Sequence, residues 1–172
     1  MRTIILLRHA KSSRDDPALD DFDRPLAPRG RRALAAVTAM LRRRKTAPDL
    51  VLCSSAMRTR ETLRGIASGL GGEPALVYEK RLYLASATKL LERLREIDDA
   101  VATVLLIGHN PGLQRLALLL AGRGEHEALA RLAEKFPTAA LAELSFPGKR
   151  WSELGAGSGE LLHLWGPKDG EE

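Results

Sequence analysis

The sequence has one cysteine, Cys53, and only 4% aromatic residues. A lone cysteine excludes a disulfide within the chain and any cysteine cluster that could hold zinc. This cysteine usage suits a reducing compartment, and we expect a cytoplasmic protein. The few aromatic residues leave few surfaces on which nucleic-acid bases could stack.

Long apolar runs are absent as well. The first residues, Met1-Arg2-Thr3, lead into an apolar run that lacks the length and cleavage site of a signal peptide, and no stretch is long enough to span a membrane. We therefore expect no membrane association. The 172 residues, 44% of them hydrophobic, suffice for the core of one domain over residues 1–172, with a short disordered tail at about 167–172.

Acidic residues are outnumbered, and the formal net charge is +5. Basic proteins gain affinity for nucleic acid by releasing counterions from its backbone. Here many of the arginines flank an apolar helical stretch, which indicates a solvated helix face, and we expect no nucleic-acid partner. These arginines stand at positions 29, 31, 32, 42, 43 and 44.

The common nucleotide-binding motifs are missing too. There is no G-x-x-x-x-G-K-[ST] loop, and the glycines at 155, 157 and 159 lie in a polar stretch that does not follow a strand. Cys53 and Arg58 invite comparison with cysteine phosphatases, but only four residues separate them and no glycine opens the intervening loop. We therefore interpret Cys53 as a small buried hydrophobic residue.

Apolar runs alternate with amphipathic helical segments along the whole chain. This order predicts an α/β fold with a mainly parallel sheet that is covered by helices on both faces. Strands are expected near 4–7, 49–53, 75–78, 102–107, 139–146 and 160–165, and helices near 28–45, 56–70, 86–98, 113–120 and 125–134.

Two histidines directly follow predicted strands. His9 stands beside Arg8 after the first strand, and His109 follows Gly108 after the strand at 102–107. Functional residues of open α/β sheets gather at the carboxyl ends of the strands, so both are expected to face one pocket. A guanidinium group suits two phosphate oxygens, and a neutral imidazole is a nucleophile near neutral pH.

A third strand end carries Ser54-Ser55-Ala56-Met57-Arg58, which opens the helix near 56–70. A helix N-terminus offers free N–H groups and a positive dipole end. Arg58 in this first turn is therefore placed to add a second guanidinium group to a bound phosphate. Glu61 is a candidate to orient one of the arginines.

These elements resemble the histidine phosphatase superfamily, which includes phosphoglycerate mutases and acid phosphatases. More narrowly, the chain is similar to the small SixA-type phosphohistidine phosphatases. The blocks that carry this resemblance are Arg8-His9-Ala10-Lys11-Ser12-Ser13, Asp21-Phe22-Asp23-Arg24-Pro25-Leu26, Arg81-Leu82-Tyr83-Leu84-Ala85-Ser86, Gly108-His109-Asn110-Pro111-Gly112 and Phe136-Pro137-Thr138-Ala139-Ala140. The resemblance implies a three-layer α/β/α sandwich of the phosphoglycerate mutase type, without a metal or another cofactor.

The resemblance also implies roles for single residues. His9 becomes the nucleophile that takes the phosphoryl group, and three further side chains hold that group: Arg8, Arg58 and His109. Ser12 and Asn110 are expected to bind substrate, and Arg24 either reaches the pocket or braces the Asp-rich loop. Arg14 stands where close relatives often carry a tryptophan, so it is expected to alter the pocket rim. Lys11 either adds positive charge at the rim for an acidic partner or is a solvated charge.

The sequence does not determine whether the site has a general acid or which residue it is. Either Glu79 serves, or Lys80 stands in its place and no acid exists; we favour the second interpretation. An imidazole leaving group titrates near neutral pH and can depart already protonated, whereas an alkoxide needs a proton donor. The lack of an acid thus favours phosphohistidine of a signalling or phosphocarrier protein as substrate, and a monomeric enzyme is the default.

Two alternatives remain. A broad-specificity phosphomonoesterase would act on small phosphate compounds with the same residues. A noncatalytic phosphoprotein-binding module would use the arginines without turnover, but the presence of His9 argues against it.

Overall fold

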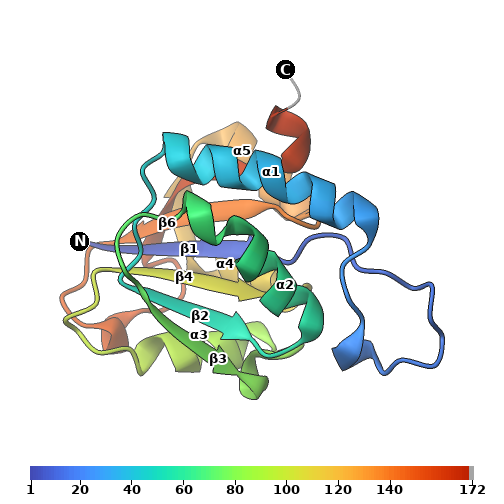
Figure 1. The fold of residues 1–172 in the computed structure, drawn as a ribbon. Helices are drawn as coiled ribbons and strands as arrows, with labels where there is room; N and C mark the ends of the chain where they lie inside the picture. The colour runs from blue at the N-terminus through green and yellow to red at the C-terminus, as the bar shows by residue number, and fades with distance from the viewer. Residues whose placement is uncertain (171–172) are drawn as a thin grey trace.

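The computed structural model describes residues 1–170 of the chain. One seven-stranded sheet forms its middle layer, with helices on both faces (Figure 1). The strands are β1 (Arg2–Arg8), β2 (Leu50–Ser54), β3 (Ala75–Glu79), β4 (Thr103–Gly108), β5 (Ala121–Gly124), β6 (Leu141–Phe146) and β7 (Gly159–Trp165). The helices are α1 (Pro28–Arg43), α2 (Met57–Ile66), α3 (Ala87–Arg95), α4 (Gly112–Leu120) and α5 (His126–Glu134). Short 3₁₀ helices span Asp21–Asp23, Ala67–Gly69, Lys80–Leu82, Trp151–Glu153 and Pro167–Gly170.

The strand order is β3-β2-β4-β1-β6-β7-β5. The strands β1, β2, β3 and β4 pair in parallel, and β6 runs antiparallel to both of its neighbours. The expected mainly parallel α/β sheet is therefore confirmed. Parallel pairing brings the carboxyl ends of β1, β2 and β4 to one edge of the sheet, where a ligand site is expected.

The apolar runs of the central strands explain the layering. Successive strand residues point to opposite faces of a sheet, so a strand that is apolar throughout needs cover on both sides. In β1, Ile4 and Leu6 belong to the core under α3, α4 and α5, whereas Ile5 and Leu7 belong to the core under α1 and α2. All four side chains are buried.

The expected helices and strands are all present, with ends that differ by a few residues, but β5 was not predicted. Its sequence, Ala-Gly-Arg-Gly, has little intrinsic preference for a strand. It becomes one because the edge of β7 offers backbone partners for parallel pairing.

The C-terminal segment is a short helix as far as it is described. Pro167–Gly170 is helical, and the rest of the disordered tail that we expected, residues 171 and 172, lies outside the described residues. No helix within residues 1–170 is both long and apolar enough to cross a membrane.

Candidate active site

The two histidines meet at the edge where β1 and β4 end. Arg8 pairs with Gly108 in the strand register, and the His9 amide donates a hydrogen bond of 3.1 Å to the Gly108 carbonyl. The imidazole rings that follow lie 5.3 Å apart, centroid to centroid. Both side chains are buried. Parallel strand pairing has thus joined residues that are a hundred positions apart in sequence.

A pocket of about 290 Å³ opens at this strand edge. It contains seven of the eight predicted site residues, and Glu79 is the exception. The lining consists of Arg8, His9, Lys11, Ser12, Arg14, Asp21, Arg24, Arg58, Leu84, His109, Asn110 and Thr138. Five of these side chains are cationic and only one, Asp21, carries a carboxylate, so the pocket suits an anion.

The hydrogen bond of His9 defines which of its nitrogens can react. Nδ1 lies 2.7 Å from the carbonyl oxygen of Ala10. A carbonyl only accepts, so Nδ1 carries the proton and Nε2 keeps its lone pair. Burial, together with the charges of Arg58 and Arg8, lowers the pKa of His9 to about 4. The ring is therefore neutral at physiological pH.

His109 is held by a different partner. Its Nε2 lies 2.8 Å from the Ser54 hydroxyl, at the end of β2. Burial and the neighbouring ring of His9 lower its pKa to about 3, so His109 is neutral as well. Its Nδ1 is buried and has no hydrogen-bond partner among the described residues.

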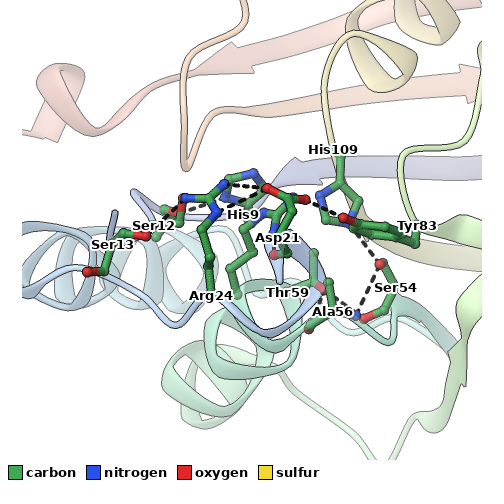
Figure 2. Close-up of polar contacts among 12 residues, drawn as sticks. His9, Ser12, Ser13, Asp21, Arg24, Ser54, Ala56, Thr59, Tyr83 and His109 are labelled. Atoms are coloured by element: carbon green, nitrogen blue, oxygen red, sulfur yellow. Dashed lines mark hydrogen bonds and ion pairs between the residues drawn. The ribbon is translucent and has the colours of Figure 1, made fainter. Parts of the chain in front are cut away.

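Arg58 enters the pocket from the first turn of α2 and is almost fully buried. Its guanidinium group donates to the Asp21 carbonyl at 2.7 Å and to the Asp21 carboxylate at 2.9 Å. Tyr83 also donates its hydroxyl proton to this carboxylate (Figure 2). Asp21, in place of the proposed Glu61, therefore orients the buried arginine, while Glu61 pairs with Arg31.

The Asp21 carboxylate is the acceptor for three different side chains. The hydrogen bond from Tyr83, followed by those from Arg24 and Arg58, holds the pKa of Asp21 well below its usual range. Asp21 is therefore ionised at neutral pH and cannot serve as a proton donor.

Arg8 and Asn110 converge on the segment after α5. Arg8 donates to the Phe136 carbonyl at 3.0 Å, and the Asn110 side-chain amide donates to the same oxygen at 2.8 Å. The Nε groups of Arg8 and Arg58 are buried without a partner among the described residues. Buried polar groups are rarely left unpaired, so these N–H groups are available to an anion in the pocket.

Arg24 has both of the positions that we considered for it. It lines the pocket, and it also braces the loop by donating to the Ser12 hydroxyl at 2.8 Å and to the Ser13 carbonyl at 3.0 Å (Figure 2). Ser12 is thereby held at the pocket wall.

Glu79 lies away from the pocket, at the end of β3. Its carboxylate accepts hydrogen bonds from Arg93 at 2.9 Å and from Arg81 at 3.2 Å. Burial raises the pKa of Glu79, but these arginines outweigh it and the pKa is lowered. Glu79 therefore does not fit the acid role that we considered, because it is ionised and does not reach the histidines. Lys80, beside it, lies over the ring of Phe22.

Cys53 is buried in the core below the site. Burial raises the pKa of its thiol to about 12, so the thiolate is not formed near neutral pH. This is the environment of a packing residue. Within residues 1–170, no group of three histidine, cysteine, aspartate or glutamate side chains is arranged to hold a metal ion.

Three residues that hold other side chains of the site in place were not predicted as site residues. Asp21 and Tyr83 stand in blocks that the resemblance singled out, and Ser54 stands in the segment before Arg58. Their side chains act on other side chains, and a contact of that kind leaves no pattern in a single sequence.

Comparisons with known proteins agree with this geometry. Residues 4–100 match the model of the histidine phosphatase superfamily (branch 1). An uncharacterized protein of Mycobacterium leprae is 40% identical over 166 residues, which cover 94% of this chain and all of the relative.

Two solved structures named "putative phosphohistidine phosphatase SixA" are similar over almost the whole length. The one from Nakamurella multipartitia is 30% identical with a TM-score of 0.80, and covers 96% of either chain. The one from Agrobacterium tumefaciens is 28% identical with a TM-score of 0.79, and covers 96% of this chain and 99% of the other.

Proposed function

Because the chain belongs to the histidine phosphatase superfamily and is a phosphatase, we propose that it removes the phosphoryl group from phosphohistidine of a protein, by way of a covalent phosphohistidine at His9. The support comes from the protonation state of His9 and from the lack of a proton donor in the pocket. The alternative is a broad-specificity phosphomonoesterase.

In the first step, the Nε2 lone pair of His9 attacks phosphorus. The new N–P bond forms as the N–P bond of the substrate breaks, and the substrate imidazole leaves with the electron pair. Arg8 and Arg58 bind the phosphoryl oxygens and balance their charge. Phosphoryl transfer depends mainly on positioning and charge stabilisation, which these side chains supply.

His109 donates the remaining hydrogen bond. The Ser54 hydroxyl accepts from the Ala56 amide at 3.4 Å, and its own proton is free to be donated to Nε2 of His109. The ring proton then resides on Nδ1, the atom that is buried without a partner. Nδ1–H is thus the donor to a phosphoryl oxygen.

In the second step, water attacks the phosphorus of phosphorylated His9. An O–P bond forms, the N–P bond breaks with its electrons returning to Nε2, and inorganic phosphate leaves as dihydrogen phosphate, which carries both protons of the water. The Ala10 carbonyl keeps the proton on Nδ1 throughout, so the phosphorylated ring is a cation. A cationic ring leaves as neutral imidazole, which makes this step favourable.

The main support for the proposed substrate class is the ionised state of Asp21. Asp21 has the only carboxyl group among the described residues that line the pocket, and its lowered pKa keeps it ionised. The two histidines are neutral, so the free site holds no acid ready to protonate an alkoxide. An imidazole leaving group needs none, because it can depart already protonated.

The test compares specificity constants for a phosphohistidine phosphocarrier protein, an aryl phosphate and an alkyl phosphate. We expect kcat/KM to fall in that order, since the need for a proton donor rises in that order. The Glu79→Gln variant should leave all three values within about twofold. An alkyl phosphate that is hydrolysed best would reject the phosphohistidine assignment and favour the phosphomonoesterase.

A further inference from the structure

A second and larger cavity adjoins the catalytic pocket. This basic groove has a volume of about 770 Å³ and lies between the start of α1, the segment 134–140 and the end of β7. Lys11 and Thr138 line both the groove and the catalytic pocket. The groove therefore adjoins the pocket and can receive a part of the substrate that extends beyond the phosphoryl group.

Exposed positive charge gathers around this groove. Its rim carries five exposed cationic side chains that have no ion pair or hydrogen bond with any described residue: Lys11, Arg29, Arg32, Lys135 and Lys168. Among the described residues, Glu134 is the only carboxylate in the lining.

Two arginines of the α1 segment that lie outside the groove form ion pairs. Arg31 contacts Glu61 at 3.1 Å, and Arg44, just past the helix, contacts Glu143 at 2.7 Å. Like charges that are gathered without partners repel one another. An anionic ligand relieves this repulsion, so its binding in the groove is favourable.

The floor of the groove is apolar. Ala33 and Ala36 of α1 face it on one side, and Pro137 and Leu164 on the other. Trp165 lies in the floor with only 6% of its surface exposed, so it offers no free ring on which a base could stack. An apolar floor with a cationic rim fits a chain of mixed carboxylate and apolar side chains better than a free inorganic anion or a nucleic-acid strand.

We propose that the basic groove binds a carboxylate-rich polypeptide segment of the phosphoprotein substrate while the phosphorylated side chain occupies the catalytic pocket. This inference rests on the proposed function, because it takes the substrate to be a protein. It makes the groove a determinant of specificity that is separate from the residues that react with phosphorus. Lys11, which is shared by the two cavities, is the link between them.

Binding can be tested on the intact protein without any turnover. The probe is a fluorescent, unphosphorylated peptide in which Asp and Glu alternate with apolar residues, and its control has Asn and Gln in their place. Anisotropy should show binding of the acidic peptide that is at least tenfold tighter than that of the neutral peptide, and that weakens as salt is added.

Two charge-matched double variants locate the site. Arg29→Gln with Arg32→Gln neutralises the rim, whereas Arg43→Gln with Arg64→Gln removes the same charge from exposed positions outside the groove. The rim variant should bind the acidic peptide at least fivefold more weakly, and the control variant should stay within twofold of the wild type. Both should hydrolyse an aryl phosphate at the wild-type rate, which also shows that both fold.

The outcomes separate the two proposals. Equal binding of the two peptides, an equal loss in the two variants, or displacement of the peptide by an oligonucleotide at lower concentration would overturn the groove proposal. A protein that binds the acidic peptide through the groove but leaves phosphohistidine intact would contradict the proposed function instead. If phosphohistidine is hydrolysed with equal KM in the acidic and in the neutral peptide, the groove proposal is contradicted and the proposed function is not.

Discussion

His9 and His109 occupy equivalent places at the ends of two paired strands, yet their hydrogen bonds make them chemically different. The Ala10 carbonyl holds the proton of His9 on Nδ1 and leaves Nε2 free to attack. The Ser54 hydroxyl engages Nε2 of His109 and leaves Nδ1 toward a ligand. At the scale of single residues, the proposed division into nucleophile and donor therefore depends on one carbonyl and one hydroxyl.

The Ser54→Ala variant tests the donor role of His109. Removing the hydroxyl leaves a buried ring nitrogen unpaired, at a cost of about 1–3 kcal/mol, and frees the ring to change its orientation or protonation. We expect kcat/KM for an aryl phosphate to fall by about tenfold to a hundredfold. Ser55→Ala, one residue further along, is the matched control and should stay within about twofold. Wild-type activity in Ser54→Ala would exclude this role for the hydroxyl.

The predicted residues Arg8, His9, Arg58 and His109 do lie in one pocket, but the residues that position them were not predicted. Arg8, His9, Arg58 and His109 could be predicted because strand ends and a helix start bring them to one edge. Asp21 could not be singled out, since the loop before the first long helix also contains Asp15, Asp16, Asp20 and Asp23. Which aspartate meets Arg58 depends on how the loop folds back, which local sequence does not determine.

At the scale of elements, the site depends on how closely α1 packs against the loop that follows β1. Gly30 in the first turn of α1 is buried, and a Cβ atom there would lie 2.1 Å from the Lys11 carbonyl oxygen. Only glycine allows this approach. The loop that carries His9 into the pocket is thus held against a helix start, and the backbone of Lys11 cannot move aside without shifting its neighbours.

The Gly30→Ala variant should therefore harm both stability and activity. We expect a loss of about 1–3 kcal/mol in the free energy of unfolding, because the clash involves backbone, and a lower kcat/KM through displacement of the loop. Urea unfolding and steady-state kinetics measure the two effects. The control is Gly65→Ala in α2, where the new Cβ meets only the flexible Leu34 side chain. This packing argument would be contradicted if Gly30→Ala left stability and activity unchanged while Gly65→Ala lowered them.

The elements themselves were predictable to the extent that their own residues form them. The apolar runs of β1 and β4 and the amphipathic pattern of α3 each determine their state locally, and the Ser86 hydroxyl that accepts from the Lys89 amide marks where α3 begins. The strand β5 has no such signal and exists only because β7 lies beside it. Tertiary pairing of this kind is the part of a fold that a single sequence conceals.

At the scale of the whole molecule, the site lowers stability in acid. Burial lowers the pKa of His9 to about 4 and that of His109 to about 3, from 6.5. Between these values and 6.5 the unfolded chain binds more protons than the folded one, so the free energy of unfolding increases with pH across this window. Above pH 6.5 both states hold neutral imidazoles, and this contribution no longer changes.

We therefore predict that the free energy of unfolding falls as the pH is lowered from 6.5 to 4.5, with each histidine contributing up to about 1.4 kcal/mol per pH unit. The His109→Gln variant should show a shallower dependence on pH than the wild type. His126→Gln, at an exposed position of α5, should show the same dependence as the wild type. Identical slopes for all three proteins, from denaturant titrations at several pH values, would contradict burial of a neutral His109.

Trapping a phosphoryl group on Nε2 of His9 is the most direct test of the proposed mechanism. Wild-type protein is mixed with a phosphohistidine phosphocarrier, quenched in base within the first turnover, digested and analysed by mass spectrometry and phosphorus NMR. We expect acid-labile phosphate on His9, at Nε2, and none in His9→Ala. Phosphate at Cys53, at a serine or at His109 in the wild type, or turnover by His9→Ala at the wild-type rate, would contradict it.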